Sequence, residues 1–157
     1  MSERTMDATT EHAATGETPM SGAPDKVNLL AVAAYAERFA EPAFTPGEWV
    51  HPEPREDGVT ILGWWDASEA VLAWEQALYD RHIIDPDSDY LGKPSVALVK
   101  RALADPSLVD GMDLPMLRRV LTFIVRGERH AGGGWYERAF ASGMAQATTR
   151  RLGELAE

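Results

Sequence analysis

The sequence has no cysteine and only four histidines, at positions 12, 51, 82 and 130. The absence of thiols excludes disulfides, a thiolate nucleophile and any cysteine-based zinc site. No two histidines stand at the short helical spacing that presents two ligands to one metal ion. We therefore expect neither a metal site nor a cofactor.

One acidic segment resembles half of a calcium-binding loop. Asp85, Asp87 and Asp89 alternate as the first ligands of such a loop do. The loop also needs glycine at its sixth position and glutamate at its twelfth, where this sequence has Tyr90 and Val96. We interpret the segment as an ordinary acidic turn.

Long apolar runs are absent as well. No stretch reaches the roughly 20 residues that cross a bilayer, and the first residues lack the apolar core of a signal peptide. We expect a chain that makes no contact with a membrane and is cytoplasmic.

The net charge of −10 is unevenly distributed. Residues 1–40 contain 6 acids and 3 bases, residues 41–90 contain 12 acids and 2 bases, and residues 91–157 contain 7 acids and 10 bases. The middle region is a poor match for nucleic acid, because neutralisation of phosphates dominates that affinity. The C-terminal region tolerates an anionic partner.

A change in composition divides the chain into a tail and a domain. Residues 1–24 are rich in threonine, alanine and glutamate and have no hydrophobic periodicity, which predicts a disordered N-terminal tail. Residues 25–157 carry periodic apolar segments and are long enough to form a single helical domain with its own core.

Apolar spacing predicts a mainly α fold, a compact helical domain of about six helices with a small two-stranded β-hairpin. We expect helices over residues 26–40, 66–83, 94–104, 113–126, 135–140 and 142–155. The two strands are expected at residues 48–51 and 59–62, joined by a turn at Asp57-Gly58. Trp49, Trp64 and Trp65 beside them are interpreted as core or hinge packing.

The helix after Asp113 has the longest apolar arc. Asp113 is a suitable N-cap, and Pro115 falls in the first turn, where a missing backbone N–H costs nothing. Apolar residues between Leu114 and Val125 cover an arc wide enough to pack against several neighbours. We expect the rest of the domain to pack around this helix.

Arginines occupy the remaining strip of the same helix. Arg118, Arg119 and Arg126 lie on it, and Arg129 joins them if the helix continues past Gly127. Guanidinium groups match carboxylate and phosphate with two parallel hydrogen bonds. The strip is therefore a candidate anion-binding surface.

The residues after Gly127 allow two interpretations. Glu128 falls on the apolar arc if the helix continues, so it needs an Arg or His partner in a structural ion pair. Alternatively, Glu128 acts as an acid–base group in a cleft with His130. The glycine run that includes Gly133 and Gly134 is either a turn between helices or a set of backbone N–H groups that bind an anion.

Several short motifs stand in an order that is specific when they are taken together: Gly47-Glu48-Trp49-Val50, Arg55-Glu56-Asp57-Gly58, Ala77-Leu78-Tyr79-Asp80, Leu117-Arg118-Arg119, Leu121-Thr122, Val125-Arg126, Arg129, Ser142-Gly143 and Arg150-Arg151-Leu152. Over about residues 39–155 the sequence resembles domain of unknown function 6508, a family of bacterial and phage proteins. The family has no assigned activity, so the resemblance implies a recurring intracellular domain and no particular reaction.

For function we favour a binding or regulatory module. Its partner would be anionic, such as nucleic acid, a nucleotide or an acidic protein face, and would contact Arg118, Arg119, Arg126 and Arg129. This interpretation requires the arginines to form one exposed, flat face.

Two alternatives stay open. A small enzyme would use Glu128 or His130 as the acid–base group, with Arg126 and Arg129 holding an anion around one concave pocket. A phage-type decoy would use the acidic residues of 41–90 to mimic nucleic acid and inhibit a host nucleic-acid-binding protein.

Overall fold

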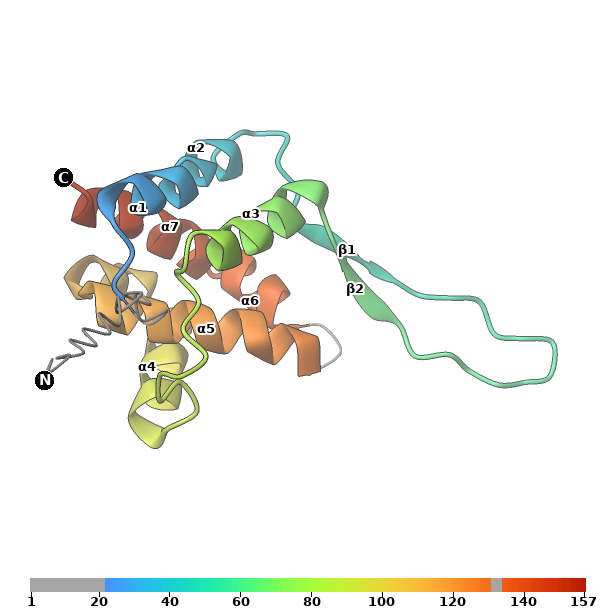
Figure 1. Cartoon of the computed structure of the whole chain (residues 1–157). Coiled ribbons are helices and arrows are strands. Elements are labelled where there is room, and N and C mark those ends of the chain that lie inside the picture. The colour runs from blue at the N-terminus through green and yellow to red at the C-terminus, as the bar shows by residue number, and fades with distance from the viewer. Residues whose placement is uncertain (1–21, 131–133) are drawn as a thin grey trace, which may run out of the picture.

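The computed structural model describes residues 22–130 and 134–157, and Figure 1 shows how they are arranged. In these residues, seven α-helices, one 3-10 helix and a two-stranded antiparallel sheet form a helical body with a projecting hairpin. The predicted mainly α fold with a small hairpin is confirmed. The predicted tail at residues 1–24 falls almost wholly outside the described residues.

The helices agree closely with the predicted segments. The expected helix over residues 26–40 is divided at Ala34 into two, and the central helix continues through Gly127. None of the helices in the described residues is long and apolar enough to cross a bilayer. The bounds are α1 Lys26–Ala33, α2 Tyr35–Phe39, α3 Glu69–Asp80, α4 Lys93–Ala104, η1 Pro106–Gly111, α5 Leu114–His130, α6 Trp135–Ala141 and α7 Met144–Leu155.

Polar caps set where the helices begin. Asp25 accepts a hydrogen bond from the backbone N–H of Asn28 at 2.9 Å, and Asp113 accepts one from Met116 at 3.0 Å. The cap of α3 is Ser68, which accepts from Val71 at 3.4 Å, so the predicted start at residue 66 is two residues early. Residue 66 instead lies in a strand.

The core lies between α5 and the helices around it. Leu117, Val120, Leu121, Ile124 and Val125 of α5 are buried, as the apolar arc predicts. The helix contacts α4, α6 and α7, while α1 packs along α7 on the other side of the body.

Glycine permits the close approach of α1 and α7. A Cβ atom at Gly153 of α7 would lie 3.0 Å from the Cβ atom of Ala33 in α1. This separation is shorter than ordinary carbon–carbon contact. The two helices can pack at this distance because residue 153 has no side chain.

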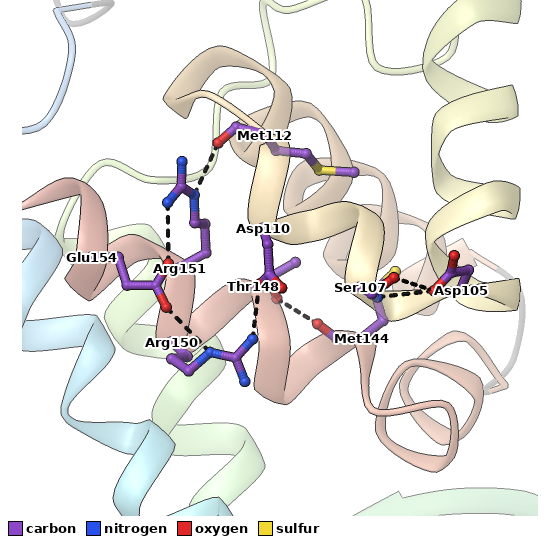
Figure 2. A network of polar contacts seen from close by, with 9 residues as sticks. All are labelled: Asp105, Ser107, Asp110, Met112, Met144, Thr148, Arg150, Arg151 and Glu154. Atoms are coloured by element: carbon purple, nitrogen blue, oxygen red, sulfur yellow. Dashed lines mark hydrogen bonds and ion pairs between the residues drawn. The ribbon is translucent and has the colours of Figure 1, made fainter.

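Arginines near the end of α7 attach it to η1, as Figure 2 shows. Arg150 forms an ion pair with Asp110 at 3.0 Å, and Arg151 donates to the backbone carbonyl of Met112 at 3.1 Å. Glu154 contacts both arginines, at 3.4 Å and 3.1 Å. Glu154 thus orients both guanidinium groups. The two arginines hold the segment around Asp110, which lies 40 residues before Arg150 in the sequence.

The hairpin consists of β1 Gly47–Val50 and β2 Trp64–Ala67, paired with Gly47 opposite Ala67 and Val50 opposite Trp64. The first strand is close to its predicted place, but the second strand is not at residues 59–62. The observed register brings Trp65 into the core. Burial of this large ring outweighs the β propensity of the predicted segment, whose side chains are exposed.

Candidate functional site

The predicted arginine strip is divided by its contacts, and Arg118 belongs to the interior. Its side chain is part of a residue only 8% exposed, and it donates to the backbone carbonyls of His82 at 3.2 Å and Ile83 at 3.1 Å. Asp85 lies 3.6 Å from the same guanidinium. Arg118 therefore satisfies carbonyls just beyond the end of α3, where a cation is favoured.

The same face of α5 holds the rest of the α3–α4 connection. Thr122, one turn after Arg118, accepts a hydrogen bond from the backbone N–H of Asp85 at 2.9 Å. Arg126, a further turn along, donates to the hydroxyl of Tyr90 at 2.9 Å and lies 5.8 Å from the centre of that ring. These three residues, at helical spacing, bind residues 82–90 of the chain itself.

The two remaining arginines are exposed. Arg129 forms an ion pair with Glu75 of α3 at 3.3 Å and stacks over Tyr79 at 4.8 Å from the ring centre. Arg119 has no ion pair within the described part of the chain. The four arginines do not form one flat cationic face, because Arg118 is buried. Binding of an external anion at this strip stays a prediction.

Glu128 lies at the start of α6, which begins directly after Gly134. One carboxylate oxygen of Glu128 accepts from the backbone N–H groups of Trp135 at 2.9 Å and Tyr136 at 3.0 Å. The carboxylate thus accepts hydrogen bonds from two N–H groups that have no partner within their own helix. These backbone groups take the place of the Arg or His side chain expected as the partner of Glu128. Gly134 precedes this helix with φ 140°, a conformation that favours glycine.

The residues of the enzyme interpretation do not converge in the described structure. Glu128 contacts α6, Arg126 contacts Tyr90 and Arg129 contacts Glu75. His130 is exposed at the end of α5, and Gly133 lies outside the described residues. No three His, Asp or Glu side chains of residues 22–130 and 134–157 gather at metal-binding distance.

A partly buried polar cluster surrounds Glu75, and the sequence analysis did not predict it. The hydroxyl of Tyr136 donates to Glu75, which also receives Arg129 at 3.3 Å. Burial raises the pKa of the Tyr136 hydroxyl far above its ordinary value, and the hydrogen bond and charge of Glu75 raise it further. Tyr136 is therefore a neutral hydrogen-bond donor that links α6 to α3.

An open groove of about 600 Å³ lies where the hairpin leaves the body. This volume is in the usual range for ligand sites. Its walls combine aromatic rings with three polar side chains from β1, α6 and α7. The lining includes the aromatic residues Phe39, Phe44, Trp49, Trp65 and Phe140 and the polar residues Glu48, Glu137 and Gln146.

The hairpin and its loop, residues 47–67, form an arm that extends away from the helices (Figure 1). Trp65 is buried at its base, but Trp49 is 41% exposed and Trp64 is 46% exposed. Of the core or hinge packing expected for the three tryptophans, packing into the core is found for Trp65 alone. Among the described residues, no second layer covers the exposed apolar side chains of this two-stranded hairpin.

Close approach at the base of the arm requires glycine. A Cβ atom at Gly47 would lie 2.4 Å from the backbone oxygen of Asp66 and 2.6 Å from the ring of Trp65. The missing side chain lets β1 lie directly against that ring. The sequence does contain a sign of this arm, because tryptophan and glycine cluster there in an acidic segment. Local propensity alone does not show whether such tryptophans are exposed or packed in the core.

Comparison with known proteins identifies the family and little else. A model of a family of unknown function (DUF6508) matches residues 24–157, which is most of the chain. Comparison with curated proteins and with solved structures gave no significant match. The chain, with its arginine-anchored helix and projecting arm, therefore belongs to this family of unknown function.

Proposed function

We propose that this chain is a binding module that engages a protein partner through the arm. The observation that carries the proposal is the exposure of apolar side chains there. Five of the ten large apolar side chains that stand exposed in the described residues belong to the arm: Trp49, Val59, Ile61, Leu62 and Trp64. Clustered exposed apolar groups are typical of interaction surfaces.

The charge of the arm selects the kind of partner. The arm contains five acids and one base, Arg55, which pairs with Asp57 at 3.6 Å. A partner with basic and apolar residues complements this surface, and nucleic acid does not. The partner class thus differs from the anionic one that the arginine strip suggested.

The backbone of the arm supports the same proposal. In the described residues β1 pairs only with β2, so each strand has an outer edge with unpaired N–H and C=O groups. Such an edge accepts an additional strand from a partner chain. Exposed tryptophans beside it supply the large contact area that dominates binding energy at interfaces.

Site-specific photocrosslinking tests the proposal. A benzophenone side chain replaces Leu62 on the arm, which is 85% exposed, and Leu91 on the α3–α4 connection serves as an exposed control. We expect position 62, and not position 91, to capture a defined basic protein in the native host.

That protein is then purified, and its affinity for the wild-type chain and for Trp64→Ser is measured. We expect a loss of about 30-fold, the typical effect of removing a central tryptophan. Equal capture at both positions, or unchanged affinity of Trp64→Ser, would contradict the proposal.

A further inference from the structure

We infer that the groove at the base of the arm is a receptor for a guanidinium group, an arginine side chain of the protein partner. This inference rests on the proposed function, because the groove and the arm share Gly47, Glu48, Trp49 and Trp65. A partner that lies along the arm would therefore pass the mouth of the groove.

The groove presents hydrogen-bond acceptors. Glu48 and Glu137 are among its lining residues, and neither carboxylate forms an ion pair with another described residue. A ligand that brings only donors complements such a surface. Among protein side chains, guanidinium has five donors and no acceptor.

Gln146 adds a third acceptor. Its amide nitrogen donates to the backbone carbonyl of Phe140 at 3.3 Å, so its oxygen is the atom that faces away from that carbonyl. This side-chain oxygen is buried and has no hydrogen-bond partner among the described residues. An unsatisfied buried acceptor carries a cost in free energy. A donor in the groove reaches this oxygen, and removes this cost, when the Gln146 side chain turns toward the groove.

The other walls of the groove suit a flat cation. Phe44 and Trp49 contribute aromatic rings, and Trp49 is 41% exposed, whereas Phe140 is buried behind them. Cations bind to the faces of such rings, tryptophan best of all, and the planar guanidinium stacks on them. Its weak hydration also lowers the cost of entering an apolar groove relative to an ammonium group.

Like charges also lie across the strand pair at the base of the arm. Glu48 and Asp66 stand directly opposite each other in the sheet, and both are exposed. Like charges at such a position destabilise a strand pair. A bound guanidinium relieves this repulsion, so binding and ordering of the hairpin reinforce each other.

Two arginines of the arm and of α6 have contacts of their own. Arg138 lies over the ring of Trp135 at 5.2 Å, and Arg55 is paired with Asp57. Neither forms an ion pair with Glu48 or Glu137. These two arginines therefore leave the groove open to a guanidinium from another molecule.

NMR titration of the full chain tests the inference without knowledge of the partner. The probe is Nα-acetyl-arginine amide, and the matched probe is Nα-acetyl-citrulline amide, which has the same shape without the charge. We expect the arginine probe to shift the indole N–H signals of Trp49 and Trp65 in a saturable way. The signal of Trp135, which packs on Phe123 outside the groove, should stay in place. The citrulline probe and Nα-acetyl-lysine amide should bind more weakly.

Charge-neutral variants locate the site. Glu137→Gln and Glu48→Gln should each weaken the arginine probe about fivefold, the effect of one partly exposed ion pair. Asp87→Asn, an equal charge change on the exposed α3–α4 connection, should leave binding unchanged. Gln146→Glu should strengthen binding, because it places a charged acceptor beside the ligand.

Specific outcomes overturn the inference. Equal binding of the arginine and citrulline probes, equal binding of the lysine probe, or the same weakening in Asp87→Asn and Glu137→Gln would each refute a guanidinium site in the groove. Absence of saturable shifts would refute it as well. If crosslinking at position 62 still captures a basic protein, the arm binds its partner without the groove, and the proposed function stands alone.

Discussion

The hydroxyl of Tyr136 donates a hydrogen bond to the carboxylate of Glu75, which joins the start of α6 to the middle of α3. Glu75 is largely buried and also receives Arg129. A neutral donor and a cation thus share one carboxylate between three helices.

Replacement of Tyr136 tests this link. We expect Tyr136→Phe to lower the free energy of unfolding by about 1–2 kcal/mol, because a hydrogen bond to a charged group is lost. Tyr79→Phe is the matched control, since the hydroxyl of Tyr79 is buried and has no hydrogen-bond partner in residues 22–130 and 134–157. Its removal should leave stability unchanged or slightly higher. Urea denaturation of both variants measures the difference, and equal losses would contradict the assigned role of Glu75.

Alkaline pH gives a second test of the same residue. The pKa of Tyr136 is raised in the folded state above the 10.0 of an ordinary tyrosine. Above that pH the unfolded chain releases the proton and the folded chain retains it, so the unfolded state binds fewer protons and stability falls. Wild type should lose stability more steeply above about pH 10 than Tyr136→Phe does. Parallel slopes for the two proteins in denaturation measured from pH 8 upward would contradict this expectation.

Neighbouring arginines on α5 provide a matched pair. Arg118→Ala leaves two backbone carbonyls without a donor and Asp85 without its cation, so we expect a loss of about 2–4 kcal/mol in unfolding free energy. Arg119→Ala removes the same charge from the exposed neighbouring position and should change stability by less than about 0.5 kcal/mol. Similar losses in both variants would show that Arg118 does not anchor the end of α3.

Variants of Glu128 distinguish helix capping from catalysis. Glu128→Ala should cost about 1–2 kcal/mol of stability, because two N–H groups of α6 lose their acceptor. Glu128→Gln retains an oxygen that accepts both hydrogen bonds and should lose about half as much, the share due to charge at a helix N-terminus. Thermal denaturation measures both. Stability equal to wild type in Glu128→Ala would remove the capping role and return Glu128 to the list of candidate reactive groups.

Local signals in the sequence determined the helices and the core of this protein. Asp113 caps α5 as its position predicts, Pro94 lies in the first turn of α4, and the apolar arc of α5 is buried. These features depend on residues within a few turns of one another, so periodicity and capping chemistry specify them.

Only the tertiary structure decided what the polar residues do. The sequence places Arg118, Thr122 and Arg126 on one face of a helix, but it does not reveal that this face receives residues 82–90. Likewise, the position of β2 depends on burial of Trp65 beside Tyr136, whose ring centre lies 6.3 Å away, and not on local β propensity. Charge and spacing define which face a side chain occupies, whereas its partner is set by packing between segments distant in sequence. The groove has the same origin, because its walls come from five separate elements, α2, β1, β2, α6 and α7, and from the segment between α2 and β1.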